Sequence, residues 1–177
     1  MWMSPSWEIY ERWCFVKAAG MLRDRLPDFL WTRERNNVWV GKVPECLVRL
    51  ELQATFLGGP GPQRWSVSRQ REPDLLLVIE RAGEERFLVL DAKYRTSRAN
   101  VLEAMASAHV YRDSLRIGER RADRALLLVP AGGGADWLEK AEFQRKQGVG
   151  VCVLNPEPEK QLPEAVAEFL EWAKAGI

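Results

Sequence analysis

Two short apolar runs separated by a turn signal constrain the fold of this chain more than any other sequence feature. The runs Leu75–Ile79 and Phe87–Leu90 are almost continuously apolar, which is typical of strands that are buried on both faces. The segment between them, residues 81–85, has the length and the glycine of a hairpin loop. The sequence therefore predicts a buried β-hairpin that folds about Gly83.

The predicted hairpin brings charged side chains together at its open end. Folding about Gly83 places Asp74, which precedes the first strand, beside Asp91 at the end of the second. Because successive side chains point to opposite faces of a strand, Asp91 and Lys93 share a face. We therefore expect the carboxylates of Asp74 and Asp91 to lie within about 6 Å, the range over which charges shift each other's pKa.

Such a cluster favours a bound cation. Two adjacent carboxylates repel each other unless a positive charge compensates them. Asp74, Asp91 and the backbone carbonyl of Ala92 offer oxygen ligands that suit Mg²⁺, which usually keeps several of its waters. The alternative is that Asp74 is a turn residue after Pro73, and that Asp91 and Lys93 form a solvated pair. The order Pro-Asp, hairpin, Asp-x-Lys is more specific than either half alone and favours a site.

The motif formed by Pro73-Asp74 and Asp91-Ala92-Lys93 resembles that of the PD-(D/E)xK nuclease superfamily, with Asp in the first position of its second part. The resemblance extends to the McrC-type nuclease domains of modification-dependent restriction systems. Three segments carry it: Tyr-Glu-Arg-Trp at 10–13 with Lys17, Asp-Ala-Lys-Tyr-Arg at 91–95, and His-Val-Tyr-Arg-Asp at 109–113.

The resemblance implies a metal-dependent DNA endonuclease that hydrolyses phosphodiester bonds, in restriction or anti-phage defence. It implies that Asp74 and Asp91 bind Mg²⁺, for which Mn²⁺ can substitute, that Lys93 serves the hydrolytic water, and that Glu11 faces the site. Relatives of this type carry an N-terminal region that engages a nucleotide-driven motor, and we expect it to be missing here because the chain starts close to the motif. The candidates for DNA contacts or for support of the site are Tyr94, Arg95, His109 and Arg112.

A first helix is predicted up to about Leu26, because its apolar residues recur at spacings of three and four. Pro27 ends it, since proline cannot continue the backbone hydrogen bonding. Glu11 lies at the margin of the apolar stripe. It therefore faces either the site or the solvent, where it would pair with Arg12 or Lys17.

A second helix is predicted at residues 99–117, directly after the Asp-x-Lys segment. His109 and Arg112 form a row beside its apolar stripe, and we expect one of them to line the same concavity as the two aspartates. The alternative for a lone histidine on a helix flank is an exposed residue without a role. Three arginines that precede the hairpin form either a DNA-facing rim or ordinary solvated charges: Arg64, Arg69 and Arg71.

The remaining pattern predicts an α/β protein. The order is a helix, three or four largely antiparallel strands, and then helix, strand, helix, strand, helix. Such an order gives a central mixed β-sheet flanked by helices, the restriction-endonuclease-like fold that the resemblance also implies. Further strands are predicted at 38–40, 47–56, 65–68, 125–129 and 149–154, and further helices at 136–147 and from Pro163.

Length and composition bound the class of protein. A chain of 177 residues is expected to form one domain over residues 1–177. No apolar run reaches the roughly 18–20 residues of a membrane span, and the N-terminus lacks the pattern of a signal peptide. Cys14, Cys46 and Cys152 are odd in number and far apart, which predicts reduced thiols in a cytoplasmic protein and no zinc site.

Function classes other than an endonuclease stay open at this point. One is a non-catalytic module that binds nucleic acid or protein with a nuclease fold, and another is a metal-dependent hydrolase of nucleotides or RNA. The net charge of +1 does not exclude DNA as the partner, because an acidic metal site inside a basic groove also sums to neutral. No base-reading motif is evident, so specificity is expected to lie in a motor or specificity subunit or to be absent. A homodimer is also open.

Overall fold

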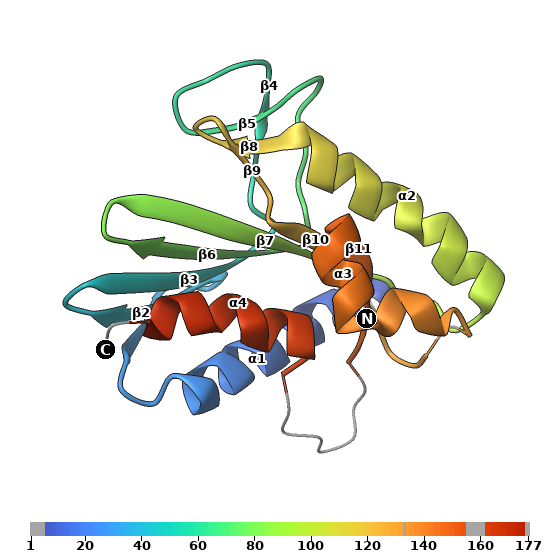
Figure 1. The fold of residues 1–177 in the computed structure, drawn as a ribbon, viewed down its shortest axis with the longest axis horizontal. Coiled ribbons are helices and arrows are strands. Elements are labelled where there is room, and N and C mark those ends of the chain that lie inside the picture. Colours follow the sequence, from blue (N-terminus) through green and yellow to red (C-terminus); the bar gives the residue numbers. More distant parts are fainter. Residues whose placement is uncertain (1–5, 133, 155–161, 176–177) are drawn as a thin grey trace, which may run out of the picture.

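A seven-stranded mixed sheet forms the centre of the computed structural model, which describes residues 6–132, 134–154 and 162–175 (Figure 1). The strands lie in the order β1-β2-β3-β6-β7-β10-β11. Neighbours from β1 to β7 are antiparallel, whereas β7, β10 and β11 are parallel. The bounds are β1 Leu30–Arg35, β2 Val38–Val43, β3 Cys46–Leu52, β6 Leu75–Arg81, β7 Glu84–Ala92, β10 Arg124–Val129 and β11 Val149–Val153.

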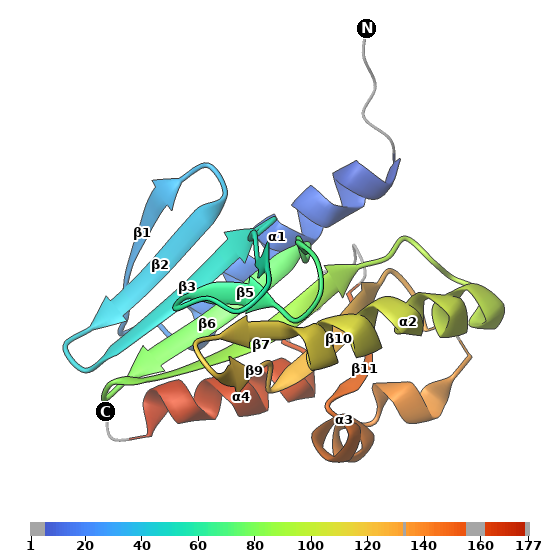
Figure 2. The ribbon, with the colours of Figure 1, turned by 90° about the horizontal axis from the view of Figure 1, so that it is seen from above.

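Helices cover both faces of this sheet. Helices α1 (Ser6–Arg25) and α4 (Glu164–Lys174) lie on one face and α2 (Arg98–Ser114) lies on the other (Figures 1 and 2). The 3₁₀ helix η1 (Asp136–Glu139) and helix α3 (Ala141–Gln147) pack beside the edge strand β11. The predicted mixed sheet flanked by helices, a restriction-endonuclease-like arrangement, is confirmed.

The central strands are apolar throughout because each contributes to two cores. In β6, Leu75, Leu77 and Ile79 pack in the core under α1 and α4. The alternate residues Leu76 and Val78 pack in the core under α2. Period-two alternation therefore separates two apolar sets rather than an apolar set from a polar one.

The central hairpin has the register that the sequence predicted. Strands β6 and β7 are antiparallel, and Arg81 pairs with Glu84, so the turn is the two residues Ala82 and Gly83. Both have positive φ, 51° and 79°, which matches the twist of a two-residue hairpin turn. The turn sets Leu75 opposite Leu90, so Asp74 and Asp91 follow as the next pair at the open end.

Several boundaries differ from the sequence predictions because tertiary pairing overrides local pattern. Helix α2 ends at Ser114 instead of 117, since Leu115–Ile117 forms strand β8 and pairs with β5. The predicted strand 47–56 ends at Leu52, and the predicted helix 136–147 is split into η1 and α3. A second sheet, which the sequence did not predict, consists of β4 Leu57–Gly58, β5 Arg64–Ser66, β8 Leu115–Ile117 and β9 Arg120–Arg121.

The cysteines and the helices have the following features in the structure. The three thiols are free and buried, and no two of them are bonded. Among the described residues, every helix is either too short or too polar to cross a membrane.

Candidate active site

The open end of the central hairpin gathers Asp74, Asp91 and Lys93. Asp74 directly precedes β6, Asp91 lies near the end of β7, and Lys93 follows β7. The Lys93 ammonium Nζ is 2.8 Å from Oδ2 of Asp91 and 3.8 Å from Oδ2 of Asp74. One cation therefore bridges two carboxylates, and the structure brings together the three side chains that the hairpin register predicted.

Both carboxylates are fixed by hydrogen bonds to the surrounding backbone and helix. Oδ2 of Asp74 accepts the backbone N–H of Ala92 at 2.8 Å, which ties the start of β6 to the end of β7. Asp91 is fully buried, and its Oδ2 accepts the hydroxyl of Ser107 from α2 at 2.6 Å. The site thus depends on the sheet and on the helix that covers it.

Helix α1 contributes Glu11 to the same cluster. The sequence left Glu11 facing either the site or the solvent. The residue is only 4% exposed and faces the site. Burial raises the pKa of its carboxyl, while a hydrogen bond from Gln53 and the charge of Lys93 lower it. Gln53 follows β3 with a positive φ of 56°, and its backbone N–H donates to the carbonyl of Asp74 at 2.7 Å.

Burial and repulsion make the carboxylate pair unfavourable in the absence of a second cation. Burial raises the pKa of Asp74 to about 8, and the neighbouring charge of Asp91 contributes to this rise. Lys93 offsets part of the effect. A divalent cation would remove it, because it favours the ionised form of both groups.

The donor set fits Mg²⁺. Two buried oxygens, Oδ1 of Asp91 and Oε1 of Glu11, have no hydrogen-bond partner in the described part of the chain. Among the residues from 6 to 175 that the structure describes, no three His, Cys, Asp or Glu side chains are placed to hold a metal by themselves. Mg²⁺ does not require such a cage, since it is usually held by one or two carboxylates and keeps several waters.

Two residues of α2 that the sequence reasoning did not assign to the site also lie there. Ser107 bonds to Asp91, and the Tyr111 hydroxyl donates to the carbonyl of Glu72 at 3.5 Å. Burial and the charges of Asp91 and Asp74 raise the pKa of Tyr111. The available signal was their spacing of four residues, which places them on one side of a helix beside its apolar stripe.

His109 and Arg112 lie away from this cluster. At about 100° per residue, they are about 160° and 140° around α2 from Ser107. They line a separate hollow of about 480 Å³ together with Trp137 and Gln147. The expectation that one of them lines the same concavity as the aspartates therefore does not match the geometry, and a DNA contact by either stays a prediction.

Tyr94 and Arg95 lie at the rim of the cluster. Tyr94 is 57% exposed, and its ring centre is 5.6 Å from that of Tyr10 on α1. Tyr10 stacks on Trp13, which extends an aromatic row along the helix. Arg95 is exposed, and its N–H donates to the carbonyl of Lys93 at 2.7 Å. Both side chains can contact a ligand that enters the site.

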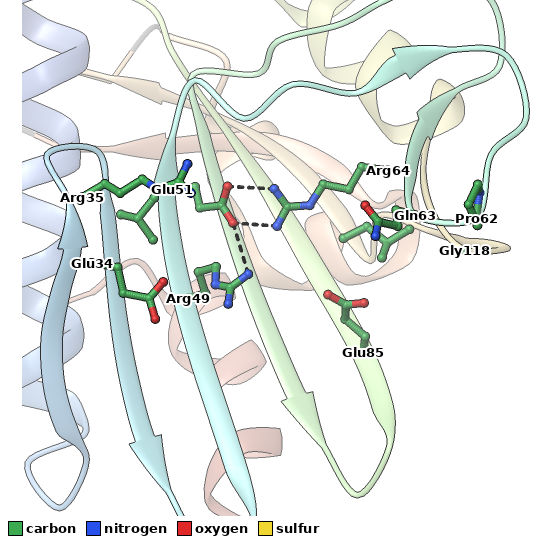
Figure 3. A pocket seen from close by; sticks show the side chains of 11 residues that line it. Glu34, Arg35, Arg49, Glu51, Pro62, Gln63, Arg64, Glu85 and Gly118 are labelled. Atoms are coloured by element: carbon green, nitrogen blue, oxygen red, sulfur yellow. Dashed lines mark hydrogen bonds and ion pairs between the residues drawn. The ribbon is translucent and has the colours of Figure 1, made fainter.

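A hollow of about 710 Å³ lies at a different place (Figure 3). It lies beside β3 and β5 and contains neither Asp74 nor Asp91. Figure 3 shows Arg64 joined to Glu51 by two hydrogen bonds, of 2.6 and 2.7 Å. Of the arginines considered as a DNA-facing rim, Arg64 is therefore neutralised by a carboxylate, which argues against a phosphate contact there.

The chain matches the model of a known protein family. The model of the family described as the PD-(D/E)XK nuclease superfamily matches residues 37–133, which is more than half of the chain. The matched segment contains Asp74, Asp91, Lys93 and the whole of α2, whereas Glu11 lies before it. Neither the curated proteins nor the solved structures contain a significant match.

Proposed function

Because the chain belongs to the PD-(D/E)XK nuclease superfamily, we propose that it is a Mg²⁺-dependent DNA endonuclease that hydrolyses phosphodiester bonds. One observation carries the proposal: Asp74, Asp91 and Lys93 meet at a buried strand end, where Oδ1 of Asp91 has no hydrogen-bond partner among the described residues. Replacing buried ionic groups by apolar ones is often neutral or stabilising. A cluster kept for stability alone is therefore a poor explanation. The complete set of Asp74, Asp91 and Lys93 argues against a fold that has lost catalysis.

Each residue has a defined task in this proposal. Asp74, Asp91 and the Ala92 carbonyl would hold Mg²⁺, which would supply positive charge to the phosphate and lower the pKa of a water. Lys93, held by Asp91, orients the hydrolytic water and offsets negative charge that develops on the phosphate. Glu11 adds a carboxylate oxygen from α1.

The wider setting is part of the same proposal. The substrate is DNA, Mn²⁺ substitutes for Mg²⁺, and the protein acts in the cytoplasm in restriction or anti-phage defence. Residues 1–177 form one nuclease domain of McrC-like type. A motor or specificity subunit, or a second copy of the chain, would supply the choice of sequence. The exposed Tyr94 and Arg95 beside Lys93 support nucleic acid as the ligand.

Purified protein and supercoiled plasmid DNA test the proposal directly. We expect nicked and then linear DNA with Mg²⁺ or Mn²⁺, and intact plasmid with a chelator. Either ion should also raise the melting temperature, because it binds only the folded site. A protein that leaves the plasmid intact and melts at the same temperature with and without both ions would be a binding module instead.

Ser107→Ala tests whether α2 supports the metal ligands. Removing the hydroxyl frees Oδ2 of Asp91 from its bond to the helix, and loss of such an outer contact typically weakens metal binding about 10- to 100-fold. We expect the Mg²⁺ concentration for half-maximal cleavage to rise by that factor. Ser114→Ala is the matched control, because this hydroxyl on the same helix has no hydrogen-bond partner in the described residues. Equal Mg²⁺ dependence of the two variants contradicts the assignment.

A further inference from the structure

A groove of about 680 Å³ opens beside the candidate active site, between α1 and the hairpin of β1 and β2. Gln53 and Arg12 line it near the cluster. Gln53 hydrogen-bonds the Glu11 carboxyl, and Arg12 is the next residue of α1 after Glu11. An extended ligand that leaves the carboxylate cluster past Glu11 therefore enters this groove.

The lining of the groove is basic. Arg12, Arg23 and Arg33 line it, and the residues that the structure places around it include no aspartate or glutamate. Arg33 donates to the backbone carbonyl of Asn36 at 2.8 Å, and the Arg23 guanidinium lies 5.3 Å from the ring centre of Trp39. These contacts orient the two guanidinium groups and leave their charge intact. The hollow in Figure 3 differs, because there Glu51 neutralises Arg64.

The arginines of α1 are arranged along the groove. Arg12, Val16, Ala19 and Arg23 follow one another at spacings of four, three and four, which places them on one side of the helix. At a rise of about 1.5 Å per residue, Arg12 and Arg23 are about 16 Å apart along the axis. A DNA strand carries one phosphate per about 3.4 Å of duplex axis. The groove is thus long enough for several phosphates of one strand.

We propose that this groove binds the phosphate backbone of one DNA strand where the strand leaves the scissile bond. The proposal rests on the endonuclease function proposed above, and it names the substrate path from that site. Arg12, Arg23 and Arg33 each contact a phosphate, and Gln53 stands at the junction of the groove and the carboxylates.

Gly20 offers a test that leaves the arginines in place. It lines the groove in the middle of α1, and a Cβ built there meets nothing within 4 Å. Glu, Gln and Lys at this position differ in charge at similar size. We expect DNA affinity to fall in the order Gly20→Lys, Gly20→Gln, Gly20→Glu, by about fivefold per unit charge at close approach. All three are better helix formers than glycine, so the melting temperature should rise by about 2 to 4 °C.

A matched pair of arginines on α1 supplies the second test. Arg23 lines the groove, whereas Arg25, two residues later, pairs with Glu171 of α4 at 2.7 Å. Arg23→Gln should weaken DNA binding and reduce the slope of log affinity against log salt by about 0.9, which corresponds to one lost phosphate contact. Arg25→Gln should leave both quantities unchanged.

Binding is measured by fluorescence anisotropy of a labelled DNA duplex with Mg²⁺, in the Lys93→Ala background, which slows cleavage during the measurement. Three results together support the proposal. DNA affinity follows the charge at Gly20, Arg23→Gln binds DNA more weakly, and Arg25→Gln binds DNA as the unsubstituted protein does. If the wild-type protein cuts plasmid but affinity does not follow the charge at Gly20, the groove proposal is wrong and the nuclease stands. If the wild-type protein neither cuts nor binds DNA, both proposals are wrong.

Discussion

Lys93→Ala is expected to lower the rate of DNA cleavage by about 10²- to 10³-fold, the usual effect of removing a group that stabilises charge in a transition state. The Lys93 ammonium contacts both carboxylates, and its side chain is 29% exposed at the end of β7. It lies outside both apolar cores, so the variant should fold and bind DNA. Plasmid cleavage with Mg²⁺, beside DNA affinity, measures the two quantities separately.

The same variant should respond more strongly to Mg²⁺ than the wild-type protein does. Without metal, it loses the cation that compensates the buried Asp91, so its melting temperature should fall. With metal, the space between the carboxylates is no longer held by an ammonium, so the rise in melting temperature should be larger. Lys42→Ala is the control, since Lys42 pairs only loosely with Glu34, at 3.8 Å on the surface. A loss of stability that is equal with and without Mg²⁺ would indicate a purely structural ion pair.

Asp74→Asn is expected to stabilise the metal-free protein at alkaline pH while it abolishes cleavage. The ordinary pKa of this carboxyl is 3.8, and the fold raises the pKa to about 8. Between these values the folded protein binds more protons than the unfolded chain does, so its stability falls as the pH rises through this window. Asparagine keeps an oxygen for the N–H of Ala92 and never ionises, so its stability should not fall in this way.

Melting curves in a chelator at pH 5 and pH 8.5 measure this effect. Relative to the wild-type protein, the variant should gain on the order of 1–3 kcal/mol of stability, or about 3–8 °C, between pH 5 and pH 8.5. Mg²⁺ should reverse the order, because only the wild-type protein has the full ligand set. Asp123→Asn is the control, since Asp123 is paired with Arg86 at 2.9 Å and its loss should not stabilise the protein. A wild-type protein whose stability in a chelator rises from pH 5 to pH 8.5 contradicts the prediction.

The parts of the site that the sequence predicted are those fixed by local geometry. Asp74, Asp91 and Lys93 belong to one hairpin, and a two-residue turn sets its register, so counting residues back from Gly83 is enough to pair them. For Glu11 the sequence left two orientations open, since a residue at the margin of a helix faces either a site or solvent. Its burial depends on how α1 packs across the sheet.

The choice between the two flanks of α2 could not be read from the sequence. Ser107 and Tyr111 lie at one margin of its apolar stripe, and His109 and Arg112 lie around the other side. His109 and Arg112 were chosen for the chemistry of their side chains, but their side of α2 does not contact the aspartates. The rotation of a helix about its axis depends on long-range packing against β7 and β10, which no local pattern encodes.

The same limit applies to the second sheet. Leu115 continues the apolar spacing of α2, yet Leu115 and Ile117 are both buried in strand β8. Their backbone pairs with β5, nearly fifty residues earlier, and this long-range pairing ends the helix. The basic groove, whose lining comes from both α1 and the β1–β2 hairpin, is likewise a property of the assembled sheet.

The position of β6 and β7 in the middle of the sheet has a consequence for hydrogen exchange. Both strands have paired neighbours on either side and apolar cores on both faces, so their amides should exchange only when the whole domain opens. The two aspartates therefore lie at the ends of the strands whose amides are expected to exchange most slowly. Mg²⁺ would then bind a geometry that already exists. Its addition should slow the exchange of all these amides together and leave their rates nearly uniform relative to one another.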